Sequence, residues 1–515
     1  MNGAETVLRA AVDAGITTCF ANPGTTEMPL VAAMDSTPGL RSVLCLFEGV
    51  CTGAADGYAR IAGVPALTVL HLGPGLANGI ANLHNARRAH TPVLNLIGEH
   101  ATWHRDADPP LNSDIEALAA TVCGRVTRLS EPTGLIDQFA DLLAFVRHPF
   151  AGPTTAIVPH DLQLADIPDG RLPEQLVESR ETVSADLVDQ AAAAVKGGGA
   201  VLILGGDALT ERGLAAAARI IAATDVVVYG GGFPARVERG KGRLSPRRLP
   251  YFPEHAAAAL ARFKAVVLVG EPEPVSFFGY AGHPGRFVRD DQQMITLAGP
   301  TGPAEAYVEA LADHLGAPVD VTPPAPRGPA QTPPTGPITP QTLAEAIAWV
   351  QPEGAIVVDE GATSTGELYF RSAAHSAPHT YLTITGGAIG FGMPCATGAA
   401  IAGGGRRVLS LQADGSAMYT LQALWTQARE GCDVTTVICD NAAYRILGVE
   451  LDRAGVSAGP TAASMVSLMP RLDWVSLARG MAVPAVAVDD VASLIAAVSR
   501  SIAEPGPMLI QARMV

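Results

Sequence analysis

The sequence predicts an α/β fold made of three consecutive domains, each built on a parallel sheet. Along most of the 515 residues, short apolar runs of strand length alternate with stretches rich in small residues. This alternation is typical of βαβ units, in which helices cover both faces of a parallel sheet. A proline-rich segment, 317–340, interrupts the alternation and is expected to be an extended linker on the surface.

The first domain is expected at residues 1–165. It opens with an amphipathic stretch of helical length, MNGAETVLRAAVDAG. The strand-like runs then follow in the order TTCFANPG, SVLCLFEG, ALTVLHLG, VLNLIGEH and TTAIVPHD. Stretches of helical length separate these runs, so a parallel sheet with crossover helices is predicted.

The middle domain is expected at residues 185–316, after a polar segment that contains proline. Its strand-like runs are AVLILGG, DVVVYGGG, AVVLVGEP and MITLAG, which is typical of a doubly wound, Rossmann-like sheet. No GxGxxG pattern with a suitable downstream acid follows a strand here, so the sequence argues against a nicotinamide or flavin oxidoreductase. The three glycines after DVVVY are interpreted as a turn.

The third domain is expected at residues 341–515. Its strand-like runs are AIVVDEG, TYLTITGG, RVLSLQAD, VTTVICDN and PMLIQARM. The first and third domains have similar lengths and similar strand spacing, so they are expected to share one architecture.

The composition excludes several classes of partner. The formal net charge is −15 and there is no long basic run, which argues against nucleic acid and against anionic membranes. No apolar run is long enough to span a membrane, and the N-terminus lacks the pattern of a signal peptide. The seven cysteines contain no CxxC pair. A cytoplasmic protein with reduced thiols is therefore expected.

Two polar residues follow neighbouring strand-like runs of the third domain. Asp414 ends VLSLQAD, and Asn441 ends VTTVICDN. In a parallel sheet both side chains would emerge at the same carboxyl edge, where open α/β sheets bind ligands. Their hard oxygen atoms, next to a small-residue turn that opens a helix, suit a Mg²⁺ ion that carries a diphosphate.

A second acidic position lies in the first domain. Glu48 follows the apolar run SVLCLF, and a helix rich in small residues is expected from Gly49 to Arg60. Apolar neighbours crowd this carboxyl, so it is expected to be withdrawn from water, as a carboxyl that exchanges a proton at neutral pH requires.

The two positions together resemble the thiamine-diphosphate (ThDP) enzymes of the acetohydroxyacid (acetolactate) synthase and benzoylformate decarboxylase group. The stretch ADGSAMY followed by DN resembles the GDG…N motif that binds metal and diphosphate, and the likeness extends over nearly the whole chain. The resemblance implies the ThDP-enzyme fold, with pyrimidine-binding, middle and diphosphate-binding domains in that order. It also implies the cofactors ThDP and Mg²⁺, and a homodimer or homotetramer with active sites between subunits. The FAD-contacting signature of the synthases is not recognisable.

The resemblance assigns roles to individual residues. Glu48 and His71 are implied to be catalytic, and Thr25 and Leu72 to contact substrate. Ile389 is implied to be the bulky residue that bends the cofactor into its V form. The implied metal ligands are Asp414, Asn441 and the backbone carbonyl of Ala443. The implied cofactor contacts are Pro23, Asn78, Ala362, Thr363, Gly387, Ile389, Asp414, Gly415, Ser416, Asn441, Ala443 and Tyr444.

Three functions are compatible with these residues. The first is decarboxylation of a small 2-oxo acid with carboligation, like the large catalytic subunit of acetolactate synthase and without FAD. The second is simple decarboxylation of the benzoylformate decarboxylase type. The third is a weakly active or non-catalytic cofactor-binding homologue, which Ala413 in the metal motif and the absence of the second histidine of the benzoylformate decarboxylase pattern motivate. Asp440 is a second departure from the metal motif. Asp440 could pair with Arg445 or stiffen its turn.

Overall fold

The computed structural model describes residues 1–148, 151–168, 182–326 and 332–515. The chain divides into two compact units. The first unit comprises Met1–Glu178, Pro333–Tyr369 and Ile384–Val515, and the second comprises Ser179–Thr332 and Phe370–Thr383. The first and third predicted domains therefore contribute to one unit. Residues 169–181, which precede the predicted middle domain, and residues 327–331, which belong to the predicted linker, lie outside the described residues.

The first sheet lies in the first unit and is parallel throughout, in the order β2-β1-β3-β4-β6-β5. Its strands are β1 (Thr18–Asn22), β2 (Arg41–Leu44), β3 (Ala66–His71), β4 (Val93–Glu99), β5 (Arg125–Arg128) and β6 (Pro153–Pro159). The helices of this region are α1 (Gly3–Asp13), α2 (Met28–Asp35), α3 (Glu48–Ala62), α4 (Leu72–Arg88), α5 (Ile115–Ala120), α6 (Leu135–Val146) and α7 (His160–Leu164).

The third sheet also contributes to the first unit, where its parallel strands have the order β17-β18-β16-β15-β13. They are β13 (Ile356–Glu360), β15 (Val408–Ala413), β16 (Val434–Asp440), β17 (Ala485–Val488) and β18 (Met508–Arg513). The helices are α12 (Pro340–Val350), α13 (Gly366–Ser372), α14 (Gly392–Ala402), α15 (Asp414–Ala417), α16 (Ala423–Glu430), α17 (Arg445–Arg453), α18 (Pro460–Val466), α19 (Trp474–Gly480) and α20 (Val491–Ala503).

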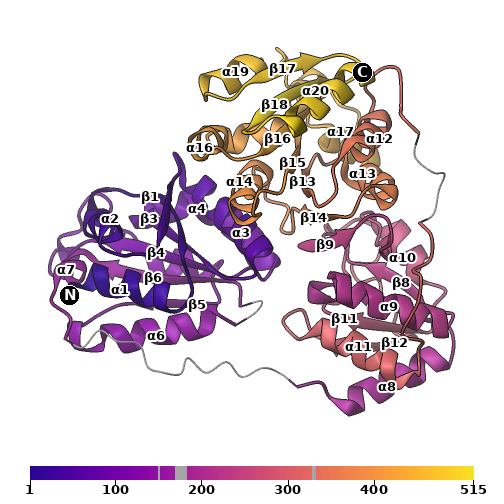
Figure 1. Cartoon of the computed structure of the whole chain (residues 1–515), viewed down its shortest axis with the longest axis horizontal. Coiled ribbons are helices and arrows are strands. Elements are labelled where there is room, and N and C mark those ends of the chain that lie inside the picture. Colours follow the sequence, from indigo (N-terminus) through magenta and orange to yellow (C-terminus); the bar gives the residue numbers. More distant parts are fainter. Residues whose placement is uncertain (149–150, 169–181, 327–331) are drawn as a thin grey trace. The chain divides into compact units, whose positions relative to one another are not determined.

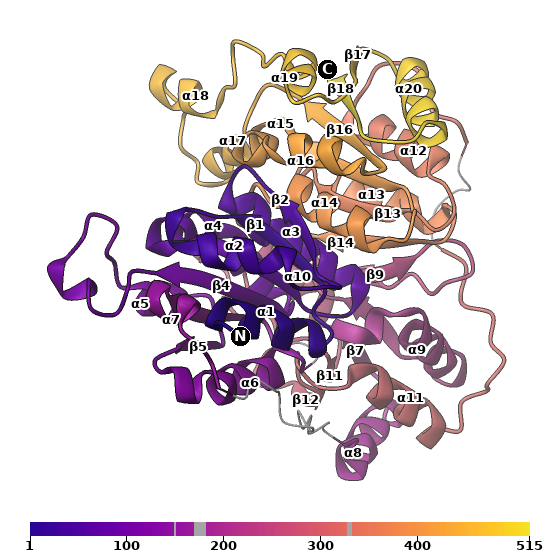
Figure 2. The ribbon, with the colours of Figure 1, turned by 60° about the vertical axis from the view of Figure 1, so that its left-hand side comes forward.

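Small residues let helices α3 and α14 approach closely, and the two helices lie side by side in both ribbon views (Figures 1 and 2). A methyl group at Gly398 would come 1.8 Å from the Ala54 carbonyl oxygen, and one at Gly57 would come 2.1 Å from that of Cys395. Only hydrogen fits at these two positions, so the glycines bring the N-terminal and C-terminal regions of this unit together.

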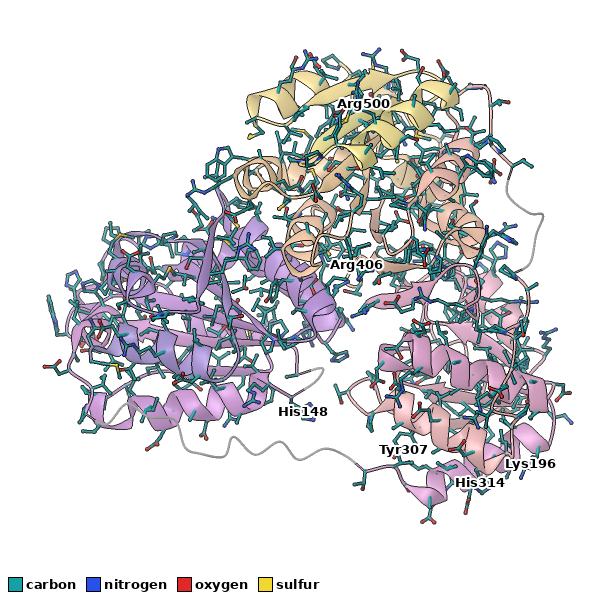
Figure 3. The ribbon with its side chains drawn as sticks, in the orientation of Figure 1. His148, Lys196, Tyr307, His314, Arg406 and Arg500 are labelled. Atoms are coloured by element: carbon teal, nitrogen blue, oxygen red, sulfur yellow. The ribbon has the colours of Figure 1, made fainter. Side chains whose placement is uncertain are left out.

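The second unit contains a parallel sheet in the order β10-β8-β7-β11-β12. In this unit β9 also pairs antiparallel with β14 (His379–Thr383). On α11, Tyr307 accepts the Ser184 N–H at 3.1 Å and His314 lies 3.4 Å from Asp189 of α8 (Figure 3). The other elements are α8 (Ala185–Lys196), α9 (Glu211–Ala223), α10 (Pro253–Leu260), α11 (Ala304–His314), β7 (Ala200–Leu204), β8 (Val227–Gly230), β9 (Arg236–Arg239), β10 (Arg247–Arg248), β11 (Ala265–Val269) and β12 (Gln293–Ala298).

Every strand-like run predicted from the sequence overlaps a strand, and the predicted α/β class with three parallel-dominated sheets is confirmed. Four strands were missed, namely β5, β9, β10 and β17. They are two to four residues long, and three of them carry arginines that obscure an apolar pattern. Among the described residues, no helix is long and apolar enough to cross a membrane. All seven cysteines are free, and six of them are buried.

Candidate active site

Glu48 is the first residue of α3, directly after an extended Phe47. Its side chain is withdrawn from solvent, because the residue is only 7% exposed. Asn78 on α4 donates its Nδ2–H to Oε2 of Glu48 at 3.0 Å. A methyl group on Gly75 would lie 3.1 Å from Oε1, so the glycine leaves this oxygen its space. The described residues send no hydrogen bond to Oε1, which leaves it available to a ligand.

His71, at the end of β3, is held by a carboxylate that sequence reasoning missed. Its Nδ1 lies 2.8 Å from Oε2 of Glu27, whose side chain is completely buried. Glu27 also accepts the Gly24 N–H at 2.8 Å and the Thr26 hydroxyl at 2.6 Å. The sequence shows only an acidic residue within NPGTTEMPL, and a solvent-exposed glutamate is equally compatible with that pattern.

The position of Glu27 decides which ring nitrogen of His71 faces outward. A carboxylate can only accept, so Nδ1 carries the proton and Nε2 remains for other partners. Gly24 makes room for this arrangement, because a methyl group there would come 2.2 Å from Nδ1. The imidazole is therefore oriented by its surroundings and is 22% exposed.

The neighbouring positions differ in how they could meet a ligand. Pro23 is half-buried and Thr25 is exposed at the start of a short 3₁₀ turn, Thr25–Glu27. Asn78 is exposed apart from its bond to Glu48. Leu72 has a left-handed backbone (φ 51°), and its side chain is buried in the core. A substrate could therefore meet the backbone of Leu72 but not its side chain.

Asp414 begins α15 at the carboxyl end of β15 and is 1% exposed. Its Oδ1 accepts the Gly415 N–H at 2.8 Å, and its Oδ2 accepts the Ala442 N–H at 2.7 Å. Burial, and to a smaller extent the negative charge of Asp440, raise the pKa of Asp414 to about 6. A bound cation would reverse this effect, because it favours the ionised carboxylate.

Asn441 and Ala443 follow β16 in a strained turn. Ala442 between them has φ 55°, and the Asn441 Oδ1 accepts the Ala443 N–H at 2.9 Å. Among the described residues, no hydrogen bond ends on the Ala443 carbonyl. A carboxylate, an amide oxygen and a free carbonyl oxygen form the donor set that Mg²⁺ prefers, so these residues fit such an ion. Within the described part of the chain, no site groups three His, Cys, Asp or Glu side chains.

The turn after Asp414 is covered by an aromatic ring. A methyl group on Gly415 would lie 2.3 Å from the Tyr444 ring, so any side chain here would have to displace that ring. Burial, the neighbouring Tyr419 and the charge of Asp414 raise the pKa of the Tyr444 hydroxyl. Ser416, the third predicted contact in this turn, is buried at 5% exposure.

The loop that carries Gly387 and Ile389 is fixed by side chains that the sequence did not reveal. Glu360, the last residue of β13, accepts the N–H groups of Gly390, Phe391 and Gly392 at 2.6–3.1 Å. Burial raises the pKa of Glu360 to about 7, although these N–H groups act in the opposite direction.

Two asparagines of α4 hold the same loop from the other side. Asn85 Oδ1 accepts the N–H groups of Gly386 and Ala388, and Asn85 Nδ2 donates to the Ala388 carbonyl at 2.8 Å. Asn82 donates to the Gly390 carbonyl at 3.2 Å. The half-buried Ile389 therefore stands on a loop with little freedom.

The last predicted loop follows β13. Asp359 accepts the Gly361 N–H at 2.9 Å and also the Thr365 hydroxyl. Ala362 is exposed with φ 48°, and Thr363 is half-buried. Leu72, Ala362 and Ala442 are thus three non-glycine residues in the left-handed region, all within or beside the predicted site. Such strain persists only where the surrounding structure imposes it, and it is concentrated at functional sites.

The two departures from the metal motif have structural explanations. Ala413 has φ −71°, a conformation open to any residue, so its methyl group causes no strain. Asp440 does not pair with Arg445; its Oδ1 lies 2.9 Å from Arg471, and its Oδ2 accepts a hydrogen bond from Gln511 at 2.7 Å. Both carboxylate oxygens of Asp440 therefore already have a partner.

Comparisons with known proteins identify the family of this chain. Residues 1–119 match the N-terminal TPP binding domain of thiamine pyrophosphate enzymes, and residues 364–512 match the C-terminal TPP binding domain. A Mycobacterium tuberculosis protein, provisionally named acetolactate synthase large subunit IlvX, is 46% identical over 99% of this chain and 98% of its own length. The chain belongs to the thiamine pyrophosphate enzyme family. The members of this family related to it act on 2-oxo acids.

Other thiamine pyrophosphate enzymes are more distant. Benzoylformate decarboxylase of Pseudomonas aeruginosa is 27% identical over 96% of each chain. A ThDP-dependent 4-hydroxybenzoylformate decarboxylase of Rhodococcus jostii superimposes with a TM-score of 0.87 and covers 100% of this chain and 99% of its own. Its identity is 24%, so it supports the fold alone. The predicted family and the ThDP-enzyme fold are confirmed.

Proposed function

We propose that the protein is a ThDP- and Mg²⁺-dependent enzyme that decarboxylates a small 2-oxo acid and joins the product to a second carbonyl compound, without FAD. The observation that carries this proposal is the carboxyl edge of the third sheet. There Asp414, Asn441 and the free Ala443 carbonyl form an all-oxygen donor set beside a turn that opens a helix. The name of the 46% identical relative supports the carboligase reading.

ThDP, when bound, supplies the electron-sink chemistry that lets a 2-oxo acid lose carbon dioxide. The chain's own residues bind and orient it. Glu48 would hold the aminopyrimidine ring and exchange a proton through its buried carboxyl, while Asn78 keeps that carboxyl in place. Asp414 and Asn441 would hold Mg²⁺, and the buried Gly415–Ser416 turn would meet the diphosphate. Ile389 would support the cofactor from its rigid loop.

We propose that the active form is a homodimer or homotetramer with shared sites. Among the described residues, no hydrogen bond or ion pair joins Glu48, His71 or Glu27 to Asp414 or Asn441. Two copies would bring the two groups together if each supplied one of them. Light scattering during gel filtration tests this, because a protein that is monomeric and active would contradict it.

A second candidate, simple decarboxylation, is favoured by the His71–Glu27 pair. The carboxylate fixes the ring through Nδ1 and leaves Nε2 directed outward, where it can exchange a proton with a bound ligand. Protonation at the reacting carbon would end the reaction as an aldehyde instead of a carboligation product. The pair therefore gives a physical reason to expect at least some aldehyde.

The deciding experiment titrates the purified protein with ThDP and Mg²⁺ and then supplies pyruvate or benzoylformate. Mg²⁺-dependent binding with acetolactate from pyruvate would support carboligation, and aldehyde alone would support decarboxylation. Binding without carbon dioxide release from any 2-oxo acid would support the non-catalytic alternative. Absence of ThDP binding would overturn the proposal.

The Glu48→Gln variant tests the proton-exchange role. It should still bind ThDP, because the diphosphate contacts are unchanged, but exchange of the C2 proton should slow by about 100- to 10,000-fold, the usual range for a general acid–base group. Exchange is followed by NMR in deuterated water. An unchanged rate would remove Glu48 from this role.

A further inference from the structure

Glu271 is an acidic residue at the carboxyl edge of the second sheet, far in sequence from every residue assigned above. β7 is central in this sheet, with β8 on one side of it and β11 on the other. From β7 the chain continues to β8 on one side, whereas β11 and β12 lie on the other side. The strand order therefore reverses between β7 and β11. Open α/β sheets bind their ligands at such a point, outside the carboxyl ends of the strands.

The Glu271 carboxyl lies over two glycines at this edge. A methyl group on Gly205, after β7, would come 2.2 Å from Oε2, and one on Gly231, after β8, would come 2.1 Å from Oε1. A side chain at either position would have to displace the Glu271 carboxyl. Glu271 therefore reaches from the end of β11 over the end of the adjacent β7 to the end of β8, one strand further on.

The described residues provide no hydrogen bond and no ion pair to this carboxyl. Burial alone raises the pKa of Glu271 to about 8, although the residue as a whole is only half-buried and can be reached from solvent. Charged groups of the surrounding elements have other partners: Asp207 accepts the Glu305 N–H, Glu305 pairs with Arg212, and Arg248 donates to the Gly232 carbonyl. A half-buried carboxyl that receives no hydrogen bond from the described residues is free to accept one from a ligand.

Three backbone N–H groups at this edge already donate to carbonyl groups of the sheet. The Gly205 N–H donates to the Val269 carbonyl at 2.9 Å, the Gly231 N–H to Leu204 at 3.2 Å, and the Gly270 N–H to Ala298 at 2.9 Å. Phosphate binding at sheet edges depends on free N–H donors. Here three of the donors are used within the sheet and the Glu271 carboxyl stands beside them, and both features disfavour the negative charge of a diphosphate such as that of FAD.

Aromatic rings border the same edge. Phe233 follows Gly231 by two residues, and its ring centroid lies 6.1 Å from that of Tyr251 and 5.6 Å from that of Phe277. Phe277 is 41% exposed, so the cluster is open to solvent. Aromatic faces attract cations, and the Arg248 guanidinium already lies 5.0 Å above the Phe233 ring.

We propose that this edge of the second sheet binds a small organic cation, a primary ammonium or guanidinium compound, with Glu271 as its counter-ion and the Phe233 cluster beside it. Such a ligand would donate a hydrogen bond to the Glu271 carboxylate and place a positive charge beside it. The site is separate from the proposed active site, and its occupancy does not depend on ThDP.

Calorimetric titration of the full-length protein at pH 8.5 tests the proposal, with n-butylammonium and n-butylguanidinium chloride as probes and n-butanol and ADP as comparisons. At least one cation should bind with a millimolar or lower Kd, and neither n-butanol nor ADP should bind. Glu271→Gln should weaken the cation at least tenfold. The matched control is Glu273→Gln, which removes an acid two residues away that already pairs with Arg286 and should leave binding unchanged.

A measurement on the unmodified protein keeps the test independent of how the variant folds. At pH 7 the cation must displace the proton of Glu271, so binding should release about one proton per cation, and at pH 9 almost none. Titration in buffers of different ionisation enthalpy measures this number. Equal affinity in Glu271→Gln, no proton release at pH 7, or binding of ADP would each overturn the proposal.

Discussion

The carboxyl edges of the second and third sheets carry similar acids in opposite surroundings. Asp414 and Glu271 both follow parallel strands, and burial raises their pKa values to about 6 and about 8. Asp414 accepts two backbone N–H groups, from Gly415 and Ala442, whereas Glu271 accepts none from the described residues. The parallel topology therefore puts an acid at the carboxyl edge of each sheet. The turn that follows the strand then determines which kind of ligand that acid can bind.

The backbone explains the difference. After β16, Ala442 has φ 55°, which turns its N–H toward Asp414 and leaves the Ala443 carbonyl free. After β11, Gly270 has φ 73°, but its N–H continues the hydrogen bonding of the sheet to Ala298. The first turn prepares a carboxylate with oxygen neighbours for a metal ion. The second turn gives the Glu271 carboxyl no hydrogen-bond donor among the described residues, so this carboxyl suits a ligand that donates hydrogen bonds.

The largest expected difference between the two edges concerns cofactor affinity. Asp414→Ala should weaken Mg²⁺-dependent ThDP binding by about 100-fold or more, because it removes the only carboxylate of the donor set, and even supporting residues of metal sites contribute about 10- to 100-fold. Glu271→Ala should leave this affinity within about twofold, since it alters a separate site. Calorimetric titration of both variants with ThDP measures the contrast. An equal loss of ThDP affinity in the two variants would contradict the different roles assigned to Asp414 and Glu271.

A second test addresses the turn of the third sheet. Gly415→Ala should weaken ThDP binding by about tenfold, equivalent to about 1.4 kcal/mol, because the added methyl group would displace the Tyr444 ring. Gly448→Ala is the matched control, since a methyl group there meets nothing within 4 Å. If both variants bound ThDP like the parent, the close approach of Tyr444 would have no role in binding.

A third test compares Glu360, which accepts backbone N–H groups, with Glu271, which accepts none from the described residues. The pKa values of Glu360 and Glu271 are raised to about 7 and about 8, so each acid is protonated in the folded protein where it would be ionised in the unfolded chain. Stability from either group is complete below the ordinary pKa, near 4.5, and is lost as pH rises to 7 for Glu360 and to 8 for Glu271.

The two glutamine variants should therefore behave differently on heating. Glu271→Gln should melt near the parent temperature at pH 5 and above it at pH 8.5, because glutamine has no proton to lose. Glu360→Gln should melt lower than the parent at every pH, since an amide can no longer accept all three N–H groups, a loss of about 1–3 kcal/mol. Thermal unfolding of each variant from pH 5 to 8.5 decides this. A pH-independent gap for Glu271→Gln would contradict its raised pKa.

The smallest expected effect concerns the residue before Asp414. Ala413→Gly restores the motif glycine, yet ThDP affinity should change by less than about twofold, because φ −71° is as accessible to alanine as to glycine. Titration with ThDP and Mg²⁺ provides the measurement. A large gain in affinity would mean that the methyl group obstructs the metal site in a way that the backbone does not reveal.

The sequence by itself determined the architecture and the chemical class of the site. Strand-length apolar runs were sufficient to predict every long strand, because buried parallel strands must be apolar on both faces. Asp414, Asn441 and Glu48 could be singled out because each follows such a run, and the carboxyl ends of parallel strands meet at one edge. Short strands rich in arginine, such as β5 and β10, lack that signal and were missed.

Only the tertiary structure decided which polar groups support the site and which stand alone. Glu27 meets His71 from 44 residues away, and Glu360 meets Gly390 from 30 residues away. Asp440 pairs with Arg471 and not with Arg445, although Arg445 is nearer to it in the sequence. Glu271 looks like any strand-end acid in the sequence, and its lack of a partner depends on N–H groups used elsewhere in the sheet. Hydrogen-bond partners are set by distances in space, so residue type and spacing along the chain could not determine them.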